Sequence, residues 1–447
     1  MERIVKVQKI KIKHLKNVLY GAIQLPVKFN ELEKSTVVGL YGQNGSGKTT
    51  VVDAFKIIKQ LISGWVSDTK LPSVERQLIH IEKDTLQLTV DFIVKNSAGE
   101  YFLQYEVHLK AGAKNLYPVT ERLSYRENVR GKRMKVLIAK EGNKQLHIRT
   151  TPMNKMKDEE RVQLLVANQL AEKECVSFVF HKELKSLLQQ KLDEHEWMLV
   201  DNIASDFNRD LHIINNDNIA LIMTKYIMPF SVYLDKRRGF IPYNLETPAI
   251  LPKELFHTLS AVINQTNKVL SMIIPGLEVE IHKISEQMLD DGGSGIRFEF
   301  LSKRGERKLP LRTESEGILK IVSVLSALIG VYNNPNACVV IDELDSGVFE
   351  YLLGELLTII EESGKGQLFF TSHNLRLLEV LSNKNLWFTT TNENNRYIQL
   401  KGIKAVNNMR DVYIRAVQLG GQEEEIYQET KTFRIKKAFR KAGETYD

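Results

Sequence analysis

The spacing of apolar residues changes along this chain, from the alternation typical of strands to the spacing typical of a helix. Residues 4–12 and 22–29 alternate apolar and polar positions in part, which predicts half-buried or edge strands, with Pro26 at an edge position. Residues 36–41 are almost all apolar, which predicts a strand covered on both faces. Apolar residues recur at helical spacing from 51 to 62, so this strand, a glycine-rich stretch and a helix are expected in succession.

The pattern changes again further along the chain. Residues 84–109 and 116–149 predict antiparallel hairpins. Residues 153–275 predict mainly helices, and because no heptad pattern persists there, a long coiled coil is not expected. Strands and helices then alternate, with strands expected at 277–301, 337–341, 367–370 and 386–391, and helices at 315–332 and after residues 348 and 373.

Composition narrows the class of protein. The 447 residues are 43% hydrophobic and 26% charged, as in a globular protein, which argues against a disordered chain, a collagen-like fibre or a disulfide mini-protein. Cys175 and Cys338 show no metal-ligand spacing, so a cysteine zinc site is not expected and a reducing compartment is. No apolar stretch resembles a secretory signal or reaches the length of a membrane span, so we expect a cytoplasmic protein without a membrane partner.

The glycine-rich stretch carries the strongest chemical signal. Residues 42–50 read GQNGSGKTT and match the pattern GxxxxGK[ST] between a buried strand and a helix. Glycines let backbone N–H groups turn toward phosphate oxygens, and the helix N-terminus adds its positive dipole end. Lys48 would neutralise phosphate charge, and Thr49 would ligate Mg²⁺. The predicted nucleotide-binding residues are Asn44, Gly45, Ser46, Gly47, Lys48, Thr49 and Thr50.

A second buried strand ends in two acids. Asp342 and Glu343 follow the apolar run at 337–341, and acids at the carboxyl edge of a parallel strand face the loop after the first strand. Asp342 is placed to hold Mg²⁺ and Glu343 to orient or deprotonate an attacking water. His373 ends another buried strand, where it could donate to a γ-phosphate or position the water, or simply cap a helix.

Ser315, Glu316 and Gly317 begin the apolar helix expected at 315–332. Ser315 is a natural N-cap, and this role alone would account for it. A serine and a glycine at a helix N-terminus also make a ready phosphate binder. Both interpretations stay open on the residues alone.

The order of these motifs resembles that of the ATP-binding-cassette (ABC) ATPases. The stretches GQNGSGKT, SEG, VVIDELDSG and FTSH are similar to the branch that includes structural-maintenance-of-chromosomes (SMC), RecF-type and overcoming-lysogenization-defect (OLD) ATPases, and HLKN at 14–17 echoes an early-strand motif of that branch. The glutamine of the family's Q-loop has no clear counterpart, and Gln104 is a weak candidate. The resemblance implies that Ser315, Glu316 and Gly317 contact a γ-phosphate held by another copy. It implies that Asp345 and Ser346 belong to a loop at the dimer interface, the D-loop. It also implies that Lys16 and Asn17 lie near the nucleotide.

The resemblance also implies a fold class and cofactors. We expect an α/β fold, a P-loop NTPase of ABC-ATPase type with an antiparallel β layer and a helical insertion, that uses ATP and Mg²⁺. Lys48 and Asp342 lie much further apart in sequence than in a bare cassette domain, so material is inserted between them. We divide the chain into four parts. Residues 1–152 are the N-terminal part of the ATPase core with the β layer, and 153–275 are a mainly helical insertion. Residues 276–400 are the C-terminal part of the core, and 401–447 are a basic tail.

Partners follow from the same resemblance. The sequence is similar to ATPase subunits of bacterial anti-phage systems such as PARIS and Septu, which implies an ATP-sandwich homodimer or a higher oligomer acting as sensor or scaffold. Too few residues follow His373 for the nuclease domain that OLD proteins append, so we expect a separate effector, such as a TOPRIM or HNH nuclease. The trigger could be nucleic acid or a phage protein.

Rival interpretations remain open. A RecF- or SMC-like clamp in DNA repair would bind duplex DNA, which the net charge of +7 permits without requiring it. A transporter subunit fits the inserted material less well, and nothing in the sequence resembles the acceptor pocket of a phosphotransferase. Two basic patches could contact phosphates or be solvated faces: Arg126, Arg130, Lys132, Arg133, Lys135 and Lys140, and, around Phe433 and Phe439, Lys431, Arg434, Lys436, Lys437, Arg440 and Lys441; Arg237 and Arg238 could serve either role.

Overall fold

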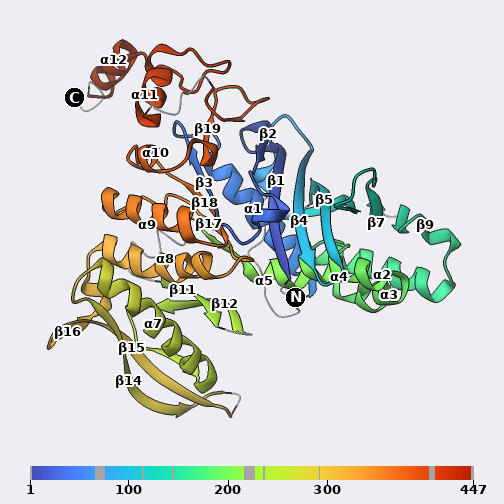
Figure 1. The fold of residues 1–447 in the computed structure, drawn as a ribbon, viewed down its shortest axis with the longest axis horizontal. Helices are drawn as coiled ribbons and strands as arrows, with labels where there is room; N and C mark the ends of the chain where they lie inside the picture. The colour runs from blue at the N-terminus through green and yellow to red at the C-terminus, as the bar shows by residue number, and fades with distance from the viewer. Residues whose placement is uncertain are drawn as a thin grey trace.

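The computed structural model describes residues 3–65, 76–112, 115–142, 145–215, 227–234, 237–290, 292–401 and 408–443 (Figure 1). For residue 76 and for 227–234 and 237–244 only the backbone is described. Helices and strands alternate around a central sheet, and a second, larger sheet packs beside it.

The central sheet is parallel except at one edge. Its six strands lie in the order β10-β17-β18-β3-β19-β20, and only β20 runs antiparallel to its neighbour. Every residue of β3, β17 and β18 is buried, as the apolar runs predict for strands covered on both faces. The strands are β10 (Leu211–Ile214), β17 (Cys338–Ile341), β18 (Gln367–Thr371), β3 (Thr36–Tyr41), β19 (Leu386–Thr389) and β20 (Tyr397–Ile398).

Helices cover both faces of this sheet. On one face α1 (Lys48–Ile62) packs with the alternate strand residues Val38, Leu40 and Phe369. On the other face α8 (Glu316–Asn333) and α9 (Glu350–Ser363) pack with the intervening strand residues. The period-two alternation of strand side chains therefore divides one sheet between two hydrophobic cores.

The antiparallel layer packs against the α1 face. Its eight strands lie in the order β2-β1-β4-β5-β6-β7-β8-β9, so the expected hairpins are part of one continuous meander. The strands are β1 (Ile4–Leu15), β2 (Val18–Gln24), β4 (Thr85–Asn96), β5 (Gly99–Ala111), β6 (Leu116–Glu127), β7 (Lys135–Glu141), β8 (Gln145–Ile148) and β9 (Thr151–Pro152).

Buried polar side chains join β1 to the central sheet. The Gln367 amide accepts from the Val7 N–H at 2.7 Å and donates to the Val7 carbonyl at 2.8 Å. Asn336 accepts from the Val5 N–H at 2.7 Å. Lys6 donates to the carbonyls of Lys34 and Lys365, both at 2.6 Å. These bonds satisfy backbone groups where the two sheets meet without sharing a ladder.

The segment expected to be mainly helical contains strands as well. It holds α2 (Asp158–Glu174), α3 (Lys185–Lys191), α4 (Glu194–Asp201), α5 (Asn208–Asp210) and α7 (Lys253–Ile273), together with β10 to β13. β10 belongs to the central sheet and pairs in parallel with β17, so the segment is interwoven with the central sheet. A four-residue apolar run such as LHII cannot be told from a helical turn by periodicity, which explains the difference.

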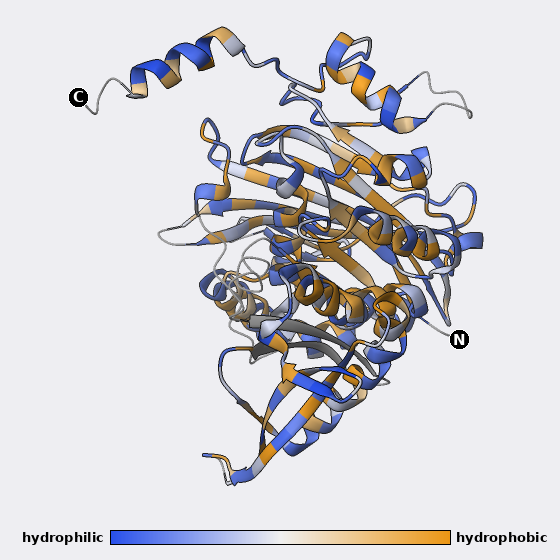
Figure 2. Ribbon diagram, turned by 90° about the vertical axis from the view of Figure 1, so that its left-hand side faces the viewer, coloured by the Kyte–Doolittle hydropathy of each residue, from blue (hydrophilic) through white to orange (hydrophobic). Residues whose placement is uncertain are grey.

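A separate lobe lies below the central sheet in Figure 1. Helix α7 packs on a sheet of β13 (Ala249–Pro252), β14 (Glu278–Met288), β15 (Ser294–Arg304) and β16 (Arg307–Pro310), and β11 (Ile227–Leu234) pairs with β12 (Arg237–Asn244) nearby. The hydrophobic core of this lobe includes Leu319, Val322 and Leu325 of α8. Helix α8 is therefore buried between two cores, as its apolar residues on all sides indicate (Figure 2).

Among the described helices, α8 alone is long and apolar enough to span a bilayer by length and composition. Two thirds of its span are buried inside the molecule, as in the core helix of a globular protein.

The C-terminal part of the chain runs along the top of the molecule. Helix α11 (Met409–Leu419) packs through Met409 and Ala416 on the central core, with the Tyr413 ring stacked on Phe388. Helix α12 (Thr432–Gly443) projects away from the body, and every one of its residues is exposed (Figures 1 and 2).

The Gln367 contact gives a stability prediction. Gln367→Leu should lower the free energy of unfolding by about 2–4 kcal/mol, because it leaves a buried N–H and a buried carbonyl of Val7 unpaired. Urea unfolding followed by circular dichroism measures the change. Gln169→Leu on the exposed face of α2 is the matched control and should shift stability by less than about 0.5 kcal/mol. Equal effects of the two substitutions would contradict the assignment.

Candidate nucleotide-binding and hydrolytic site

The loop between β3 and α1 has the backbone of a phosphate cradle. Gly42, Gly45 and Gly47 have φ of 150°, 74° and 98°, conformations that side chains with a Cβ rarely adopt. At Gly42 a Cβ would also lie 1.7 Å from the Thr389 hydroxyl. These glycines turn the loop so that α1 begins at Lys48, directly at the cleft.

A cleft of about 490 Å³ lies between this loop and the carboxyl ends of β17 and β18. Most residues that the sequence predicts for the site line it, and Thr371 lines it as well. Its wall consists of Lys16, Asn17, Asn44, Gly45, Gly47, Lys48, Thr49, Thr50, Asp342, Glu343, Thr371 and His373. Ser46 does not line the cleft, because its hydroxyl donates to the Gln43 carbonyl at 2.6 Å and lies against the Thr389 hydroxyl.

Lys48 extends across the loop. Its ammonium donates to the carbonyls of Gly42 at 2.7 Å and Gln43 at 3.1 Å. Burial lowers the pKa of Lys48, and the nearby carboxylates of Asp342 and Glu343 act in the opposite direction. Its charge is therefore fixed at the floor of the cleft.

Asp342 is buried at the end of β17. Its Oδ1 accepts from the Thr371 hydroxyl at 2.5 Å and from the Thr49 hydroxyl at 3.4 Å, while its buried Oδ2 has no hydrogen-bond partner. Burial raises the pKa of this carboxyl. An unpartnered carboxylate oxygen beside a threonine hydroxyl is the donor set that Mg²⁺ prefers, so these residues fit the metal that the sequence predicts.

Glu343 adopts a left-handed backbone conformation, with φ of 47°. Its N–H donates to the Thr371 hydroxyl at 2.8 Å, so one threonine positions both acids. The buried ammonium of Lys320 on α8 lies 3.5 Å from the Glu343 carbonyl. Burial lowers the pKa of Lys320 to about 8, and three carboxylates, led by that of Asp345, act in the opposite direction.

His373 follows β18 and faces the same cleft. Burial lowers the pKa of its imidazole, and the Lys48 charge lowers it further, which favours the neutral ring at neutral pH. The backbone N–H of His373 donates to Asp345 Oδ2 at 3.1 Å. Within the D-loop, the Ser346 N–H donates to the Glu343 carbonyl at 3.1 Å, so the D-loop is bonded to both hydrolytic candidates.

The residues at 315–317, here called the signature turn, do not line this cleft. The Ser315 hydroxyl caps α8 by accepting from the Ile318 N–H at 3.4 Å, and Glu316 is exposed. A Cβ on Gly317 would lie 2.2 Å from the carbonyl of Gly347, so the turn packs directly on the loop after the D-loop. Within one chain the signature turn packs on Gly347, directly after the D-loop, and is separate from the nucleotide cleft.

The turn between β1 and β2 also contributes to the site. Lys16 has φ of 51° and forms an ion pair with Asp53 on α1, and the Asn17 amide donates to the Gly45 carbonyl. Behind the loop, the Tyr397 hydroxyl donates to the Gly47 carbonyl at 2.8 Å.

Sequence reasoning missed Thr371 and Tyr397. Thr371 had a local signal, because it ends β18 two residues before His373. Tyr397 had none, because its contact with the loop arises only from folding. Gln104, the weak Q-loop candidate, lies on β5, where its amide donates to Asp91 at 2.7 Å, and it does not line the cleft.

One hairpin patch differs from expectation. Lys140 is fully buried near Glu121, since it faces inward on β7, so it does not belong to a surface patch. Arg126 packs over the Phe102 ring, and Lys132 pairs with Glu127. The side chains of Arg237 and Arg238 lie outside the described residues.

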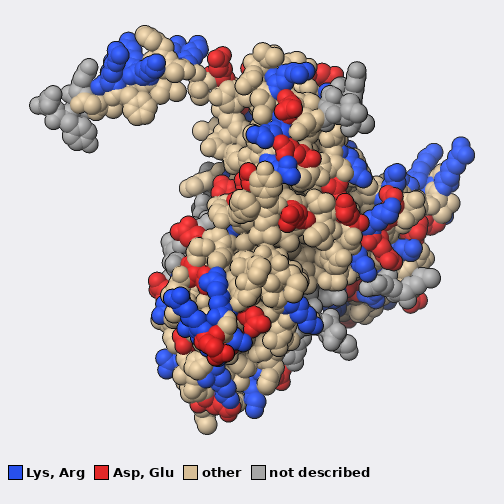
Figure 3. Space-filling view, turned by 60° about the vertical axis from the view of Figure 1, so that its left-hand side comes forward, with Lys and Arg blue, Asp and Glu red and all other residues tan. Residues whose placement is uncertain are grey.

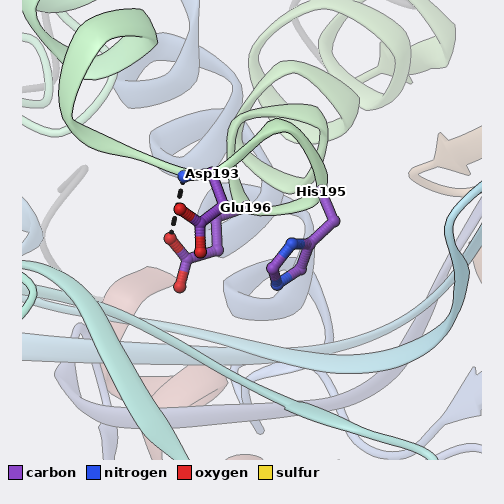
Figure 4. Close-up of side chains that lie close together, drawn as sticks. All are labelled: Asp193, His195 and Glu196. Atoms are coloured by element: carbon purple, nitrogen blue, oxygen red, sulfur yellow. Dashed lines mark hydrogen bonds between the residues drawn. The ribbon is translucent and has the colours of Figure 1, made fainter.

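Asp193, His195 and Glu196 gather near the start of α4 (Figure 4). Arg149 forms ion pairs with both carboxylates, and Tyr125 donates to Glu196 at 2.9 Å. The Arg149 guanidinium and the Tyr125 hydroxyl already pair with these acids, so the cluster joins α4 to the β layer and does not fit a metal site.

The family comparison decides the class of protein. A family described as "AAA domain, putative AbiEii toxin, Type IV TA system" matches residues 148–379, more than half of the chain. The chain belongs to this AAA-domain family. The match includes the signature turn, β17 with both acids, and His373, and it confirms the α/β P-loop ATPase fold class. A comparison with curated proteins gave no match.

Solved structures of SMC heads are similar in outline. The SmcHead bound to the C-winged helix domain of ScpA is 11% identical, with 88% of this chain and 97% of that chain covered and a TM-score of 0.42. The SMC head domain from Thermotoga maritima is 13% identical, with 89% and 99% covered and a TM-score of 0.37. A Pyrococcus furiosus Smc head is 12% identical, with 88% and 96% covered and a TM-score of 0.38.

Asp342 gives a direct test of the metal site. Mg²⁺ should increase the nucleotide affinity of the wild type, and this increase should be smaller by about tenfold or more in Asp342→Asn. The reason is that a neutral amide replaces the unpaired carboxylate oxygen. Titration with a fluorescent ATP analogue, with Mg²⁺ and with EDTA, measures this gain. Asp91→Asn on β4 is the control. An undiminished Mg²⁺ effect in Asp342→Asn would refute the assignment.

Proposed function

We propose that this AAA-family protein hydrolyses ATP with Mg²⁺ in a head-to-tail dimer. In that dimer each copy's signature turn completes the cleft of the other copy. The dimer acts as a sensor or scaffold in bacterial anti-phage defence and controls a partner effector, such as a TOPRIM or HNH nuclease. The observation that supports the hydrolytic part is the paired placement of Asp342 and Glu343, held by Thr371, at the mouth of the phosphate loop.

The chemistry divides between these groups. Lys48 and the loop N–H groups bind the phosphates, and Thr49 and Asp342 would hold Mg²⁺, which neutralises charge on the β- and γ-phosphates when bound. Glu343 accepts the proton of the attacking water, and neutral His373 orients the water or donates to a γ-phosphate oxygen. Fixed charges in a partly buried cleft need no reorganisation during the reaction.

The place of the signature turn supports the dimer. A serine-capped helix N-terminus with an exposed glycine-containing turn is suited to phosphate, yet within its own chain it packs beside the D-loop, outside the cleft. A second copy related by a twofold axis would present this turn to the open side of the cleft. Each site would then be complete only in the pair.

The defence role is supported by family membership and by the resemblance to PARIS and Septu subunits. The family's description names a putative AbiEii toxin and a type IV toxin–antitoxin system. Affinity purification of the ATP-bound protein from its host tests this role. A copurifying nuclease supports it, whereas ATP-dependent duplex DNA binding with a steep salt dependence and no partner would favour the repair clamp.

Glu343→Gln separates binding from hydrolysis. The variant should bind ATP as the wild type does, because the amide keeps its size, and should hydrolyse ATP at least about a hundredfold more slowly, because it cannot accept a proton. Nucleotide titration and phosphate release measure the two properties. Glu159→Gln on the exposed face of α2 is the control and should hydrolyse ATP normally. Wild-type turnover by Glu343→Gln would eliminate the proposed base.

Mixed dimers test whether sites are shared. Lys48→Ala and Ser315→Arg should each abolish hydrolysis alone. Mixing the two should restore activity, since one site of a mixed dimer then combines a normal phosphate loop with a normal signature turn. Phosphate release before and after mixing is the readout. A mixture as inactive as its components would indicate sites complete within single chains.

A further inference from the structure

Helix α12 is a cationic arm with an apolar stripe. Its charged residues are all basic, namely Arg434, Lys436, Lys437, Arg440 and Lys441. Ile435 and Phe439, four residues apart and 43% and 77% exposed, lie on one face with Ala438 and Ala442 between and beside them. Figure 3 shows the arm projecting from the body with its basic side chains exposed. An isolated helix of this length is marginal, so such an arm needs a surface to pack on.

The segment before the arm is fixed beside the phosphate loop. The Gln428 N–H donates to the Gln43 side chain at 3.0 Å, and Ile426 is buried. Glu424 accepts from the amides of Asn392 and Asn395 at 3.0 and 2.9 Å. Helix α12 begins four residues after Gln428, so its N-terminal end, here called its root, lies at the rim of the nucleotide cleft.

Helix α9 offers the complementary surface. It carries four glutamates and no basic residue. Tyr351, Glu355 and Ile359 follow at spacings of four on its exposed face, and Glu362 continues that face. Tyr351 and Ile359 remain 52% and 50% exposed, although Arg376 packs over the tyrosine ring, and Phe349 just before the helix is 67% exposed.

The two helices meet between copies in the proposed dimer. Helix α9 begins three residues after Gly347, beside the signature turn, and that turn faces the other copy's phosphate loop in a head-to-tail pair. The root of the arm lies at that same phosphate loop. At 1.5 Å per residue the helices are about 18 and 21 Å long, so one can lie along the other.

We infer that α12 of each copy docks on α9 of the other copy, with its apolar stripe on Tyr351 and Ile359 and its basic residues opposite Glu355 and Glu362. The inference rests on the proposed ATP-dependent dimer and adds the surface that stabilises it. A nucleic acid would use the charges of the arm and leave the apolar stripe without a partner, whereas α9 matches both.

Charge reversal tests the contact in the full chain with Glu343→Gln, which retains ATP. The arm variant carries Lys436→Glu, Lys437→Glu and Arg440→Glu, and the α9 variant carries Glu355→Lys and Glu362→Lys. Sedimentation with ATP and Mg²⁺ gives the dimer dissociation constant. Each variant should weaken the dimer about tenfold or more, and the chain carrying both sets should recover much of the loss, because the charges are again complementary.

The control and the possible outcomes separate the inference from the proposed function. Lys155→Glu, Lys173→Glu and Lys182→Glu make the same charge change around α2 and should leave the dimer unchanged. A Glu343→Gln parent that stays monomeric with ATP would overturn the dimer and the docking together. A normal dimer in both charge variants, or an arm variant that loses only duplex DNA binding, would overturn the docking alone.

Discussion

The burial of α8 between two hydrophobic cores is the constraint on which the site depends. Val324 and Leu328 pack toward the central sheet, and Leu319 and Leu325 pack toward the lower lobe. A helix enclosed on both sides has little freedom to tilt or slide, because protein interiors are close-packed. The position of its N-terminus, and with it the signature turn, is therefore fixed relative to β17, which packs on the same core.

This constraint links two sites of the proposed dimer within one chain. In that dimer the signature turn would serve the neighbour's nucleotide, whereas Asp342 and Glu343 would serve the chain's own. Between them lie the contact of Gly317 with the Gly347 carbonyl and the buried Lys320 below Glu343. The buried Lys320 resists displacement, because its ammonium would lose the attraction of three nearby carboxylates. A shift of the signature turn on binding a γ-phosphate would therefore be felt at Glu343.

The sequence predicts those features that depend on residues close together in the chain, and it does not predict those that depend on contacts between distant segments. The phosphate loop, β17 with its two acids and the N-cap at Ser315 depend on residues close in sequence, and a local pattern specifies them. The sheet position of β10 depends on pairing with β17, far along the chain, and its four residues carry no period of their own. Lys140 is buried near Glu121 because both faces of β7 are covered along 137–140, which a count of basic residues does not reveal.

Contacts between distant segments explain the rest of the site. The hydroxyl of Tyr397, on the edge strand β20, donates to the Gly47 carbonyl, and the Gln428 N–H donates to the Gln43 side chain, so segments from the C-terminal part of the chain hold the outer side of the phosphate loop. A loop that carries several positive-φ glycines has a high conformational entropy when unfolded, and such contacts reduce its freedom in the folded state. The same contacts place the root of α12 at the cleft. The phosphate loop is therefore recognisable from its own residues, while its rigidity and its connection to the arm depend on the C-terminal part of the chain.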